Sequence, residues 1–400
     1  MGYPRNWIVG DDSGAQTLTE DDHLYETHIN ELRKAIDNNV AINVLDYGAK
    51  GDGVTDDYAS VLLAIADIPA TGGKLYFPAG TYLSSGAVVV NNRPISIIGD
   101  GMGVSVLQFT SVTANGAIDL DFNDITQNCN IRDITLLAGN ANNGTAIDLA
   151  WVTTGSSTHV SCSIERVEIT SSDGGTTNYW TDGLIVYDAW NAVIKNINVR
   201  GANTKNLTQT GITLLGRSND VRISNSYFAA CYYAIKSVGV VEGLHLVDNI
   251  YIYCQKGVYV VPTTGAPPLV FINNGMFDCF EAAIDIINCP TSQIYHNYFN
   301  RRDDGETAYI HVHLGDSCNG TLVQDNFFQG SMVGGTQNGI VVDTNIYCII
   351  TGNLISACNT GVLLNAGSIK SIVSLNRFQN CSTDITDSGT SNEKINNYST

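Results

Sequence analysis

Short apolar runs separated by polar turns recur along the chain from about residue 190. One run ends in an asparagine that precedes an aromatic or apolar residue, at Asn196, Asn225, Asn249, Asn274, Asn297, Asn326, Asn353 and Asn376. A second run begins with Gly or Ala some ten residues later, at Gly211, Ala234, Gly257, Ala283, Gly339 and Gly361. The runs have the length of strands, and their period of about 26 residues (180 residues over seven intervals) is typical of a solenoid.

No helical period separates successive repeats, so each coil is expected to lie on the previous one and to pair with it as parallel strands. The sequence therefore predicts an all-β chain, a parallel β-helix. An asparagine side chain is both donor and acceptor and tolerates tight turns, so asparagines in successive coils can bond to one another and to the turn backbone. The ten cysteines fall into two ladders in phase with the strands, which indicates buried free thiols. No C-x-x-C pair occurs, and no metal site or cofactor is predicted.

Residues 17–39 have the pattern of a single amphipathic helix. Thr17 and Glu20 form a capping box, and apolar residues follow at 4-3-4 spacing from Tyr25 to Ile36. Such a helix has one apolar face and cannot bury that face by itself. It could dock on the β-helix or form a short coiled-coil neck with copies of itself, and we favour the neck. The predicted domains are a head segment and neck over residues 1–40 and a β-helix over 41–400.

The stretch N-V-L-D-Y-G-A-K-G-D-G-V-T-D-D, which starts at Asn43, is followed by strand-like segments at 72–85 and 95–109. Together they closely resemble the opening of the pectate-lyase-like superfamily of right-handed parallel β-helices, which includes polygalacturonases and phage tailspike depolymerases. The resemblance implies a capping helix at about 56–66, with Thr55 as its N-cap and Tyr58, Leu62 and Ile65 on its buried face. It covers residues 43–385. The head and helix before it resemble phage tail proteins more weakly.

The chain carries 20 Lys and Arg against 39 Asp and Glu, a net charge of −19. A nucleic acid is therefore an unsuitable partner, whereas neutral sugars, or acidic ones near local basic groups, are compatible. No apolar run approaches the ~20 residues of a membrane span, and no signal peptide opens the chain. No further domain is expected after the coils. We expect a homotrimer located on a virion tail or outside the cell, whose N-terminal segment attaches to a phage tail or baseplate.

Titratable residues gather on the second strands. If these strands align on their inward residues, the next residue of each points outward. The inward residues taken for this alignment are Ile235, Val258, Ile284, Ile310, Ile340 and Val362. The outward positions then hold Lys236, Tyr259, Asp285 and His311, with His313 and Asp343 two residues further along. This patch is either an active site or an ordinary solvated or intersubunit face. As an active site, it would use Asp285 and Asp343, about 10 Å apart over two rungs, and hydrolyse with inversion.

Two other segments complete the candidate site. The loop that contains Arg301, Arg302 and Glu306 is longer than its counterparts and is either a groove wall or a salt-bridged surface loop. In residues 178–190, aromatic side chains surround Asp182, as suits sugar rings. The phrase Trp180-Thr-Asp-Gly resembles the N-T-D-G of polygalacturonases, which implies a catalytic Asp182. The paired G-D-D of that family is absent here, so Asp182 is otherwise a turn residue.

The predicted function is an endo-acting polysaccharide depolymerase for a bacterial surface glycan, a glycoside hydrolase first. A polysaccharide lyase acting on a uronic acid is the second reading, with Tyr259 or His311 as base. A non-catalytic glycan-binding or structural fibre is the third. The candidate catalytic residues are Asp285, His311, Asp343, Glu306 and Asp182. The candidate substrate-binding residues are Tyr259, Lys236, His313, Glu281, Arg301, Arg302, Trp180, Tyr179 and Trp190.

Overall fold

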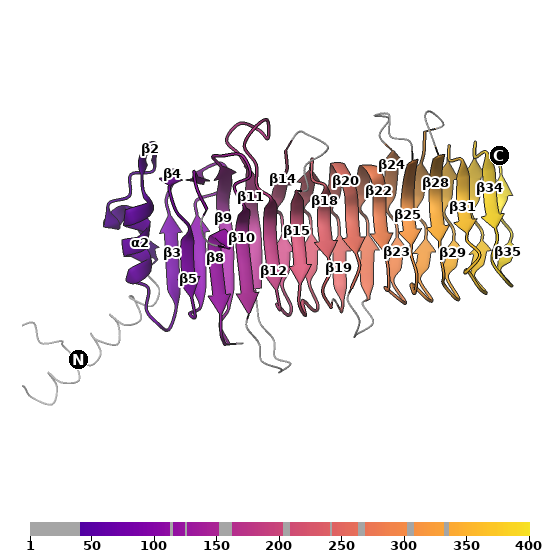
Figure 1. Cartoon of the computed structure of the whole chain (residues 1–400), viewed down its shortest axis with the longest axis horizontal. Coiled ribbons are helices and arrows are strands. Elements are labelled where there is room, and N and C mark those ends of the chain that lie inside the picture. The colour runs from indigo at the N-terminus through magenta and orange to yellow at the C-terminus, as the bar shows by residue number, and fades with distance from the viewer. Residues whose placement is uncertain are drawn as a thin grey trace, which may run out of the picture. The chain divides into compact units, whose positions relative to one another are not determined.

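The computed structural model describes residues 41–112, 115–124, 126–151, 162–202, 209–240, 242–262, 269–301, 308–331 and 336–400. The predicted head segment and neck helix lie outside these residues. From Ile42 to Thr400 the described chain forms a parallel β-solenoid, and every pairing between its strands is parallel. The predicted parallel β-helix is confirmed. The strands lie in three rows, and Figure 1 shows the coils side by side from the indigo end to the yellow end.

The first row holds the strand that precedes the asparagine turn in each coil. Two long strands, β9 (Cys129–Ala138) and β11 (Cys162–Ser171), contribute their first halves to this row and their second halves to the next. The other members are β1 (Ile42–Asn43), β3 (Gly73–Phe77), β6 (Ile95–Gly99), β13 (Val193–Lys195), β16 (Arg222–Ser224), β19 (Leu244–Val247), β21 (Val270–Asn273), β23 (Gln293–Tyr295), β26 (Leu322–Gln324), β29 (Ile349–Thr351), β32 (Ile372–Ser374) and β35 (Glu393–Ile395).

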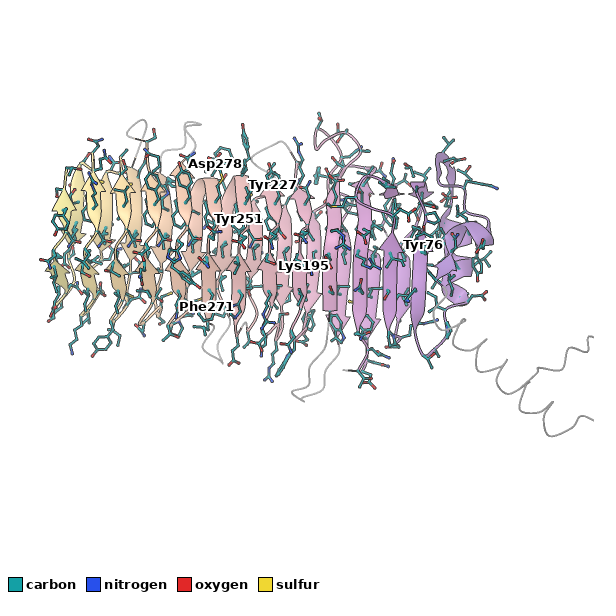
Figure 2. The ribbon with its side chains drawn as sticks, turned by 180° about the vertical axis from the view of Figure 1, so that it is seen from behind. Tyr76, Lys195, Tyr227, Tyr251, Phe271 and Asp278 are labelled. Carbon is teal, nitrogen blue, oxygen red and sulfur yellow. The ribbon has the colours of Figure 1, made fainter. Side chains whose placement is uncertain are left out.

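The second row follows the asparagine turn. Its members are β2 (Asp52–Asp56), β4 (Gly80–Ser84), β7 (Ser105–Phe109), β14 (Asn198–Arg200), β17 (Tyr227–Ala229), β24 (Tyr298–Arg301), β27 (Phe327–Gln329), β30 (Leu354–Ser356), β33 (Arg377–Gln379) and β36 (Tyr398–Ser399), with the first halves of β20 (Ile250–Val260) and β22 (Met276–Ile286). In Figure 2, Tyr227 and Asp278 lie along this row, and Lys195 and Phe271 belong to the first row.

The third row begins with the strands near the capping helix and runs to the last coils. It consists of β5 (Val88–Asn91), β8 (Gly116–Phe122), β10 (Thr145–Trp151), β12 (Asp182–Tyr187), β15 (Thr210–Leu215), β18 (Tyr233–Ser237), the second halves of β20 and β22, β25 (Ala308–Leu314), β28 (Thr336–Val342), β31 (Thr360–Leu364) and β34 (Thr383–Asp387).

The interior is filled by inward Ile, Val, Leu and Phe side chains, as the alternation along each strand requires. On the second row, five rings stack in successive coils, with centroid separations of 5.6, 4.4, 4.9 and 4.6 Å. They belong to Phe228, Tyr251, Phe277, Phe299 and Phe328. All ten cysteines are free thiols and nine are buried, which confirms that they act as small apolar residues.

The asparagine turn contains two columns of residues, and the predicted eight asparagines divide between them. Asn249, Asn297, Asn326, Asn353 and Asn376 are buried, and the last four bond in series. Asn196, Asn225 and Asn274 stand one residue earlier in their coils. They have φ values of 51 to 54° and are exposed. The prediction was wrong for these three, because asparagine suits both a bonded turn interior and a left-handed backbone.

The capping helix α2 (Tyr58–Ala66) follows the short 3-10 helix η1 (Val44–Tyr47) and lies at the indigo end in Figure 1. The predicted cap at Thr55 was wrong. Asp57 is the N-cap residue, and its carboxylate accepts the backbone N–H groups of Lys50 and Gly51, at 2.6 and 3.1 Å. Leu62, predicted to be buried, is 39% exposed. The helix buries Val61, Ala64 and Ile65 instead, so its buried stripe is rotated relative to the predicted one.

Candidate functional site

One register position on the outward face of the third row carries six titratable side chains. The pairing of β8 through β25 places one residue of each strand in line, and we call this line the titratable column. In chain order its members are Asp119, Asp148, Ile185, Thr213, Lys236, Tyr259, Asp285 and His313. Asp119, Thr213 and Asp285 are buried, and the other members are half-buried.

His313, and not His311, continues the column after Asp285. Val312, and not Ile310, is the inward partner of Ile284, so the predicted alignment was two residues out of register in β25. The sequence Ala-Tyr-Ile-His-Val-His-Leu alternates, and a shift by two residues keeps the same face apolar. His311 is fully buried against the rings of Tyr309 and Phe328. Its predicted role as an outward catalytic residue was wrong.

His313 lies between the two carboxylates that the sequence paired. Its Nδ1 is 2.8 Å from Oδ1 of Asp285, and its Nε2 is 2.9 Å from Oδ2 of Asp343. Burial disfavours a charged imidazole, but these two hydrogen bonds outweigh it and raise the pKa of His313 to about 9. Asn365 Nδ2 donates to the other oxygen of Asp343 at 2.6 Å. At neutral pH the cluster is therefore a carboxylate–imidazolium–carboxylate bridge.

Lys256, which the sequence analysis did not single out, completes this cluster. Its ammonium group is 2.7 Å from Asp285 and 3.1 Å from Glu281, and it lies 5.0 Å from the centroid of the Tyr259 ring. Burial alone would raise the pKa of Asp285, but hydrogen bonds from His313 and Lys256 hold it below its usual value. Asp285 therefore stays ionised and is a poor proton donor.

The other end of the titratable column has the opposite electrostatics. Burial, together with the charges of Asp119, Asp121 and Asp182, raises the pKa of Asp148 to about 6. Burial also raises the pKa of Asp182, although a hydrogen bond from Thr213 Oγ1 at 3.2 Å and the charge of Lys236 oppose this. Asp148 is therefore a carboxyl group that can hold a proton close to neutral pH.

The sequence did contain a signal for Asp148. The phrase Ala-Ile-Asp at 146–148 recurs at 117–119 and at 283–285, where it ends in Asp119 and Asp285. All three carboxylates occupy the same register position. The alignment used in the sequence analysis began at Ile235 and so excluded the two earlier copies.

The remaining predicted site residues do not all lie together. Lys236 lies 5.2 Å from the centroid of the Tyr233 ring, and the Tyr233 and Tyr259 rings are 5.0 Å apart, so this part of the column is an aromatic and cationic surface. Trp180 was predicted to be an exposed sugar platform, which was wrong. It is 4% exposed, its indole donates to the carbonyl of Thr170, and it packs on Phe109.

Tyr179 and Trp190 are half-buried near the two ends of β12. The backbone of Arg301 ends β24 and pairs with Cys279. The Arg301 side chain lies outside the described part of the chain, as do Arg302 and Glu306. Among the described residues, no group of three or more His, Cys, Asp or Glu side chains is arranged to hold a metal ion. None of the helices in that part is long and apolar enough to cross a membrane.

Comparison with known proteins gives relatives in sequence and in structure. Mannuronan C5-epimerase AlgE4 of Azotobacter vinelandii is 32% identical over 145 residues, which are 33% of this chain and 26% of that protein. The chain therefore matches about a quarter of the length of this relative. The A-module of mannuronan C-5 epimerase AlgE6 from the same organism superposes with a TM-score of 0.63 at 18% identity, covering 90% of this chain and 99% of the module.

Tailspike protein 3 of bacteriophage CBA120 superposes with a TM-score of 0.53 at 14% identity, covering 92% of this chain and 60% of the tailspike. At 18% and 14% identity, these two solved structures show that the chain has the same fold as they do. A family described as rhamnogalacturonase A/epimerase, pectate lyase-like, matches residues 41–259, which are 219 of the 400 residues. Because that match covers more than half of the sequence, the chain belongs to this pectate lyase-like family.

Proposed function

We propose that the chain is a polysaccharide-cleaving enzyme whose glycan lies along the titratable column and whose proton donor is Asp148. The observation that carries the proposal is the raised pKa of Asp148, about 6, to which the charge of a second carboxylate, Asp182, contributes. Glycoside hydrolysis needs one carboxyl group that is protonated near the working pH and one that is ionised. Asp148 suits the first role. Asp182, where the hydrogen bond from Thr213 and the charge of Lys236 oppose the rise in pKa caused by burial, is our candidate for the second.

The pairing of Asp285 with Asp343 is less suited to hydrolysis than the sequence suggested. An inverting pair needs a water molecule between its carboxylates, and His313 is hydrogen-bonded to both of them. We therefore assign Asp285, His313, Asp343 and Lys256 to substrate binding. Tyr233 and Tyr259, 5.0 Å apart, add ring faces on which a sugar can stack.

A lyase or epimerase reaction at C5 of a uronic acid is the second candidate. It is favoured by the mannuronan C5-epimerase that the chain resembles and by the cations Lys236, Lys256 and His313 along the column. Such a reaction requires neutralisation of the sugar carboxylate before a base removes the C5 proton. A homotrimer on a phage tail stays part of the proposal, as does its alternative, a fibre that binds a glycan without cleaving it.

The test is incubation with a panel of bacterial capsular and O-antigen polysaccharides and with mannuronan. New reducing ends without the absorbance of an unsaturated uronate would support hydrolysis. That absorbance would favour the lyase, and an altered epimer ratio without chain shortening would favour the epimerase. Binding without any chemical change would contradict both enzymatic proposals.

The Asp148→Asn variant tests the proton donor. Activity is expected to fall by a factor of about 10² to 10⁴, because the amide cannot supply a proton. The folded protein should be no less stable at pH 7, because ionisation of a carboxyl group whose pKa is raised by folding is itself destabilising above pH 6. Asp124→Asn, which changes an exposed carboxylate just beyond β8, is the matched control and should keep full activity. Equal activity of both variants would refute the role of Asp148.

A further inference from the structure

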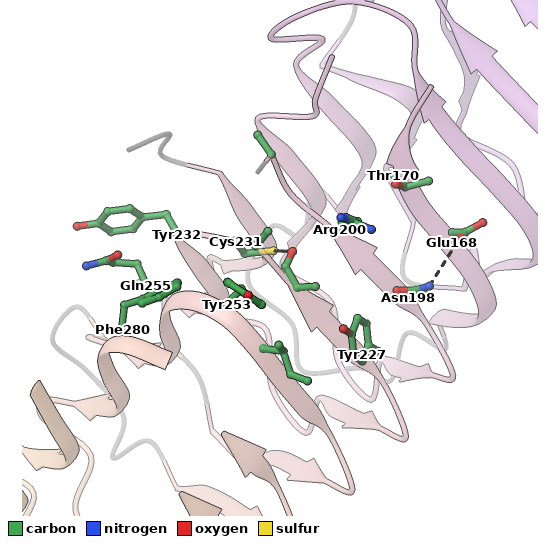
Figure 3. A pocket seen from close by; sticks show the side chains of 14 residues that line it. Glu168, Thr170, Asn198, Arg200, Tyr227, Cys231, Tyr232, Tyr253, Gln255 and Phe280 are labelled. Atoms are coloured by element: carbon green, nitrogen blue, oxygen red, sulfur yellow. Dashed lines mark hydrogen bonds between the residues drawn. The ribbon is translucent and has the colours of Figure 1, made fainter. Parts of the chain in front are cut away.

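A cavity lies on the outward side of the second row, away from Asp148. Its volume is about 560 Å³, within the range of ~300–1,000 Å³ typical of ligand sites. Strands β11, β14, β17, β20 and β22 line it. Figure 3 shows Glu168, Asn198 and Arg200 on one side and Tyr232, Gln255 and Phe280 on the other. None of these residues belongs to the site assigned above.

The polar side of the cavity carries one fixed carboxylate and one guanidinium group. Glu168 accepts hydrogen bonds from Thr135 Oγ1 at 2.9 Å and from Asn198 Nδ2 at 3.4 Å, which hold its carboxylate in position. Arg200, two residues after Asn198 on β14, is exposed at the same wall. A carboxylate accepts hydrogen bonds from vicinal hydroxyl groups, and a guanidinium group binds a carboxylate through two parallel bonds.

The cavity also offers ring faces. Tyr227 is 37% exposed and Tyr253 is 45% exposed, and both line the cavity. The Tyr253 ring lies 5.8 Å from the ring of buried Phe280. Aromatic rings of this kind stack on the apolar faces of sugars while polar neighbours bind the hydroxyl groups.

From this combination we infer that the cavity is a second glycan-binding site, which takes a hexuronate unit without reacting with it. A hexuronate carries a carboxylate for Arg200, hydroxyl groups for Glu168 and an apolar face for Tyr227. A neutral hexose lacks the carboxylate. The inference rests on the proposed function only in taking a glycan as the ligand.

The cavity also has a direct connection to the titratable column. Gln255 lines the cavity, and its amide donates to Glu281 at 3.4 Å. Glu281 is 3.1 Å from Lys256, which binds Asp285 at 2.7 Å. The cavity and the column are therefore linked by side-chain contacts around the corner between the second and third rows. Holding two segments of one polymer raises the affinity through effective concentration.

Titration calorimetry with two probes tests the inference. A mannuronate trisaccharide should bind the wild-type protein at least about tenfold more tightly than the neutral mannotriose, and Tyr227→Ala should weaken it about tenfold. Arg200→Ala should remove the preference for the acidic probe. Tyr227→Phe keeps the ring and should bind within about twofold of wild type. Tyr227→Phe therefore distinguishes the effect of losing the ring from the effect of unfolding.

Asp124→Asn, which changes an exposed carboxylate outside both sites, is the matched control, and its binding of the acidic probe should equal that of wild type. Loss of binding in Asp148→Asn, with retention in Tyr227→Ala and Arg200→Ala, would place the sugar on the column and overturn the inference. Failure of the wild-type protein to bind the acidic probe, or equal binding of both probes, would overturn it too. Cleavage of the polysaccharide panel is measured in a separate experiment, so these binding results do not test the proposed catalysis.

Discussion

His313 couples the stability of its coil to pH, because only the charged imidazole can donate from both ring nitrogens. Asp285 and Asp343 each accept one of these bonds, and the side chain is 22% exposed. Its pKa of about 9 in the folded protein lies above the ordinary value of 6.5. The stabilising contribution is therefore complete below pH 6.5 and is lost as the pH rises through 9.

The free energy of unfolding is expected to fall by about 3 kcal/mol between pH 6.5 and pH 9.5. Urea unfolding at several pH values measures this change. The His313→Gln variant should be less stable at pH 6.5, and its stability should vary less over the same range. If the unfolding free energies of the wild type and of His313→Gln changed with pH in the same way, the two carboxylates would not stabilise the charged imidazole.

Only part of the titratable column could be predicted from the sequence. Lys236, Tyr259 and Asp285 were placed correctly in one column, because Gly or Ala marks the start of each of their strands. In β25 no Gly or Ala stands directly before the inward Val312, and His311 takes the position that Ala283 and Gly339 occupy in the neighbouring coils. The position of Lys256 could not be derived, since its side chain reaches Asp285 in the next coil.

The turn between the first and second rows is stabilised by side chains that bond from coil to coil. Asn326 shows the pattern most fully. Its Nδ2 donates to the carbonyl of Ile294 and to Oδ1 of Asn353, at 2.9 and 3.0 Å. Its own Oδ1 accepts the backbone N–H and the side-chain Nδ2 of Asn297, at 2.9 and 3.0 Å. All of these groups are buried, so they have no water to replace a lost partner.

The Asn326→Ala variant is expected to lose about 3 kcal/mol of unfolding free energy, because it leaves buried donors and acceptors unpaired in both adjacent coils. Asn225→Gly is the matched control, since Asn225 is exposed and glycine adopts its φ of 51° freely. Its unfolding free energy should change by less than about 0.5 kcal/mol. Chemical denaturation measures both, and equal losses would refute the distinction between the two columns.

Sequence could predict these elements, but not which of two adjacent residues faces inward. The asparagine phrase correctly located each turn and both flanking strands. Asn225 and Asn249 look equivalent in sequence, yet Ser226 takes the buried position after Asn225 and donates to the carbonyl of Ser224. Only the register against the next coil, where Asn249 accepts the N–H of Ser226 at 3.0 Å, separates the two cases.

Across the molecule, the outward face of the second row carries an apolar stripe. Ile250, Met276 and Tyr298 occupy one register position and are 37%, 40% and 43% exposed, and the Tyr298 ring stacks on that of Phe327 at 5.1 Å. Contiguous exposed apolar side chains mark interaction surfaces. This stripe is our candidate for contact between chains in the proposed homotrimer.

Multi-angle light scattering should give three times the 42.9 kDa of one chain. Met276→Glu places a charge in the stripe and should shift the particle toward the mass of one chain. Tyr347→Glu makes a similar change at a side chain that is 54% exposed outside the stripe, and it should leave the mass unchanged. A wild-type protein with the mass of a single chain would refute the trimer.

The three rows also determine how the solenoid bears force. Hydrogen bonds between parallel strands of adjacent coils point along the axis of stacking, as do the bonds that link Asn297, Asn326 and Asn353. Tension along that axis therefore loads the coil interfaces in series, so they open one at a time at low force. A load across the axis shears every bond of a coil at once. A polymer pulled sideways over the third row meets the stiff direction of the protein.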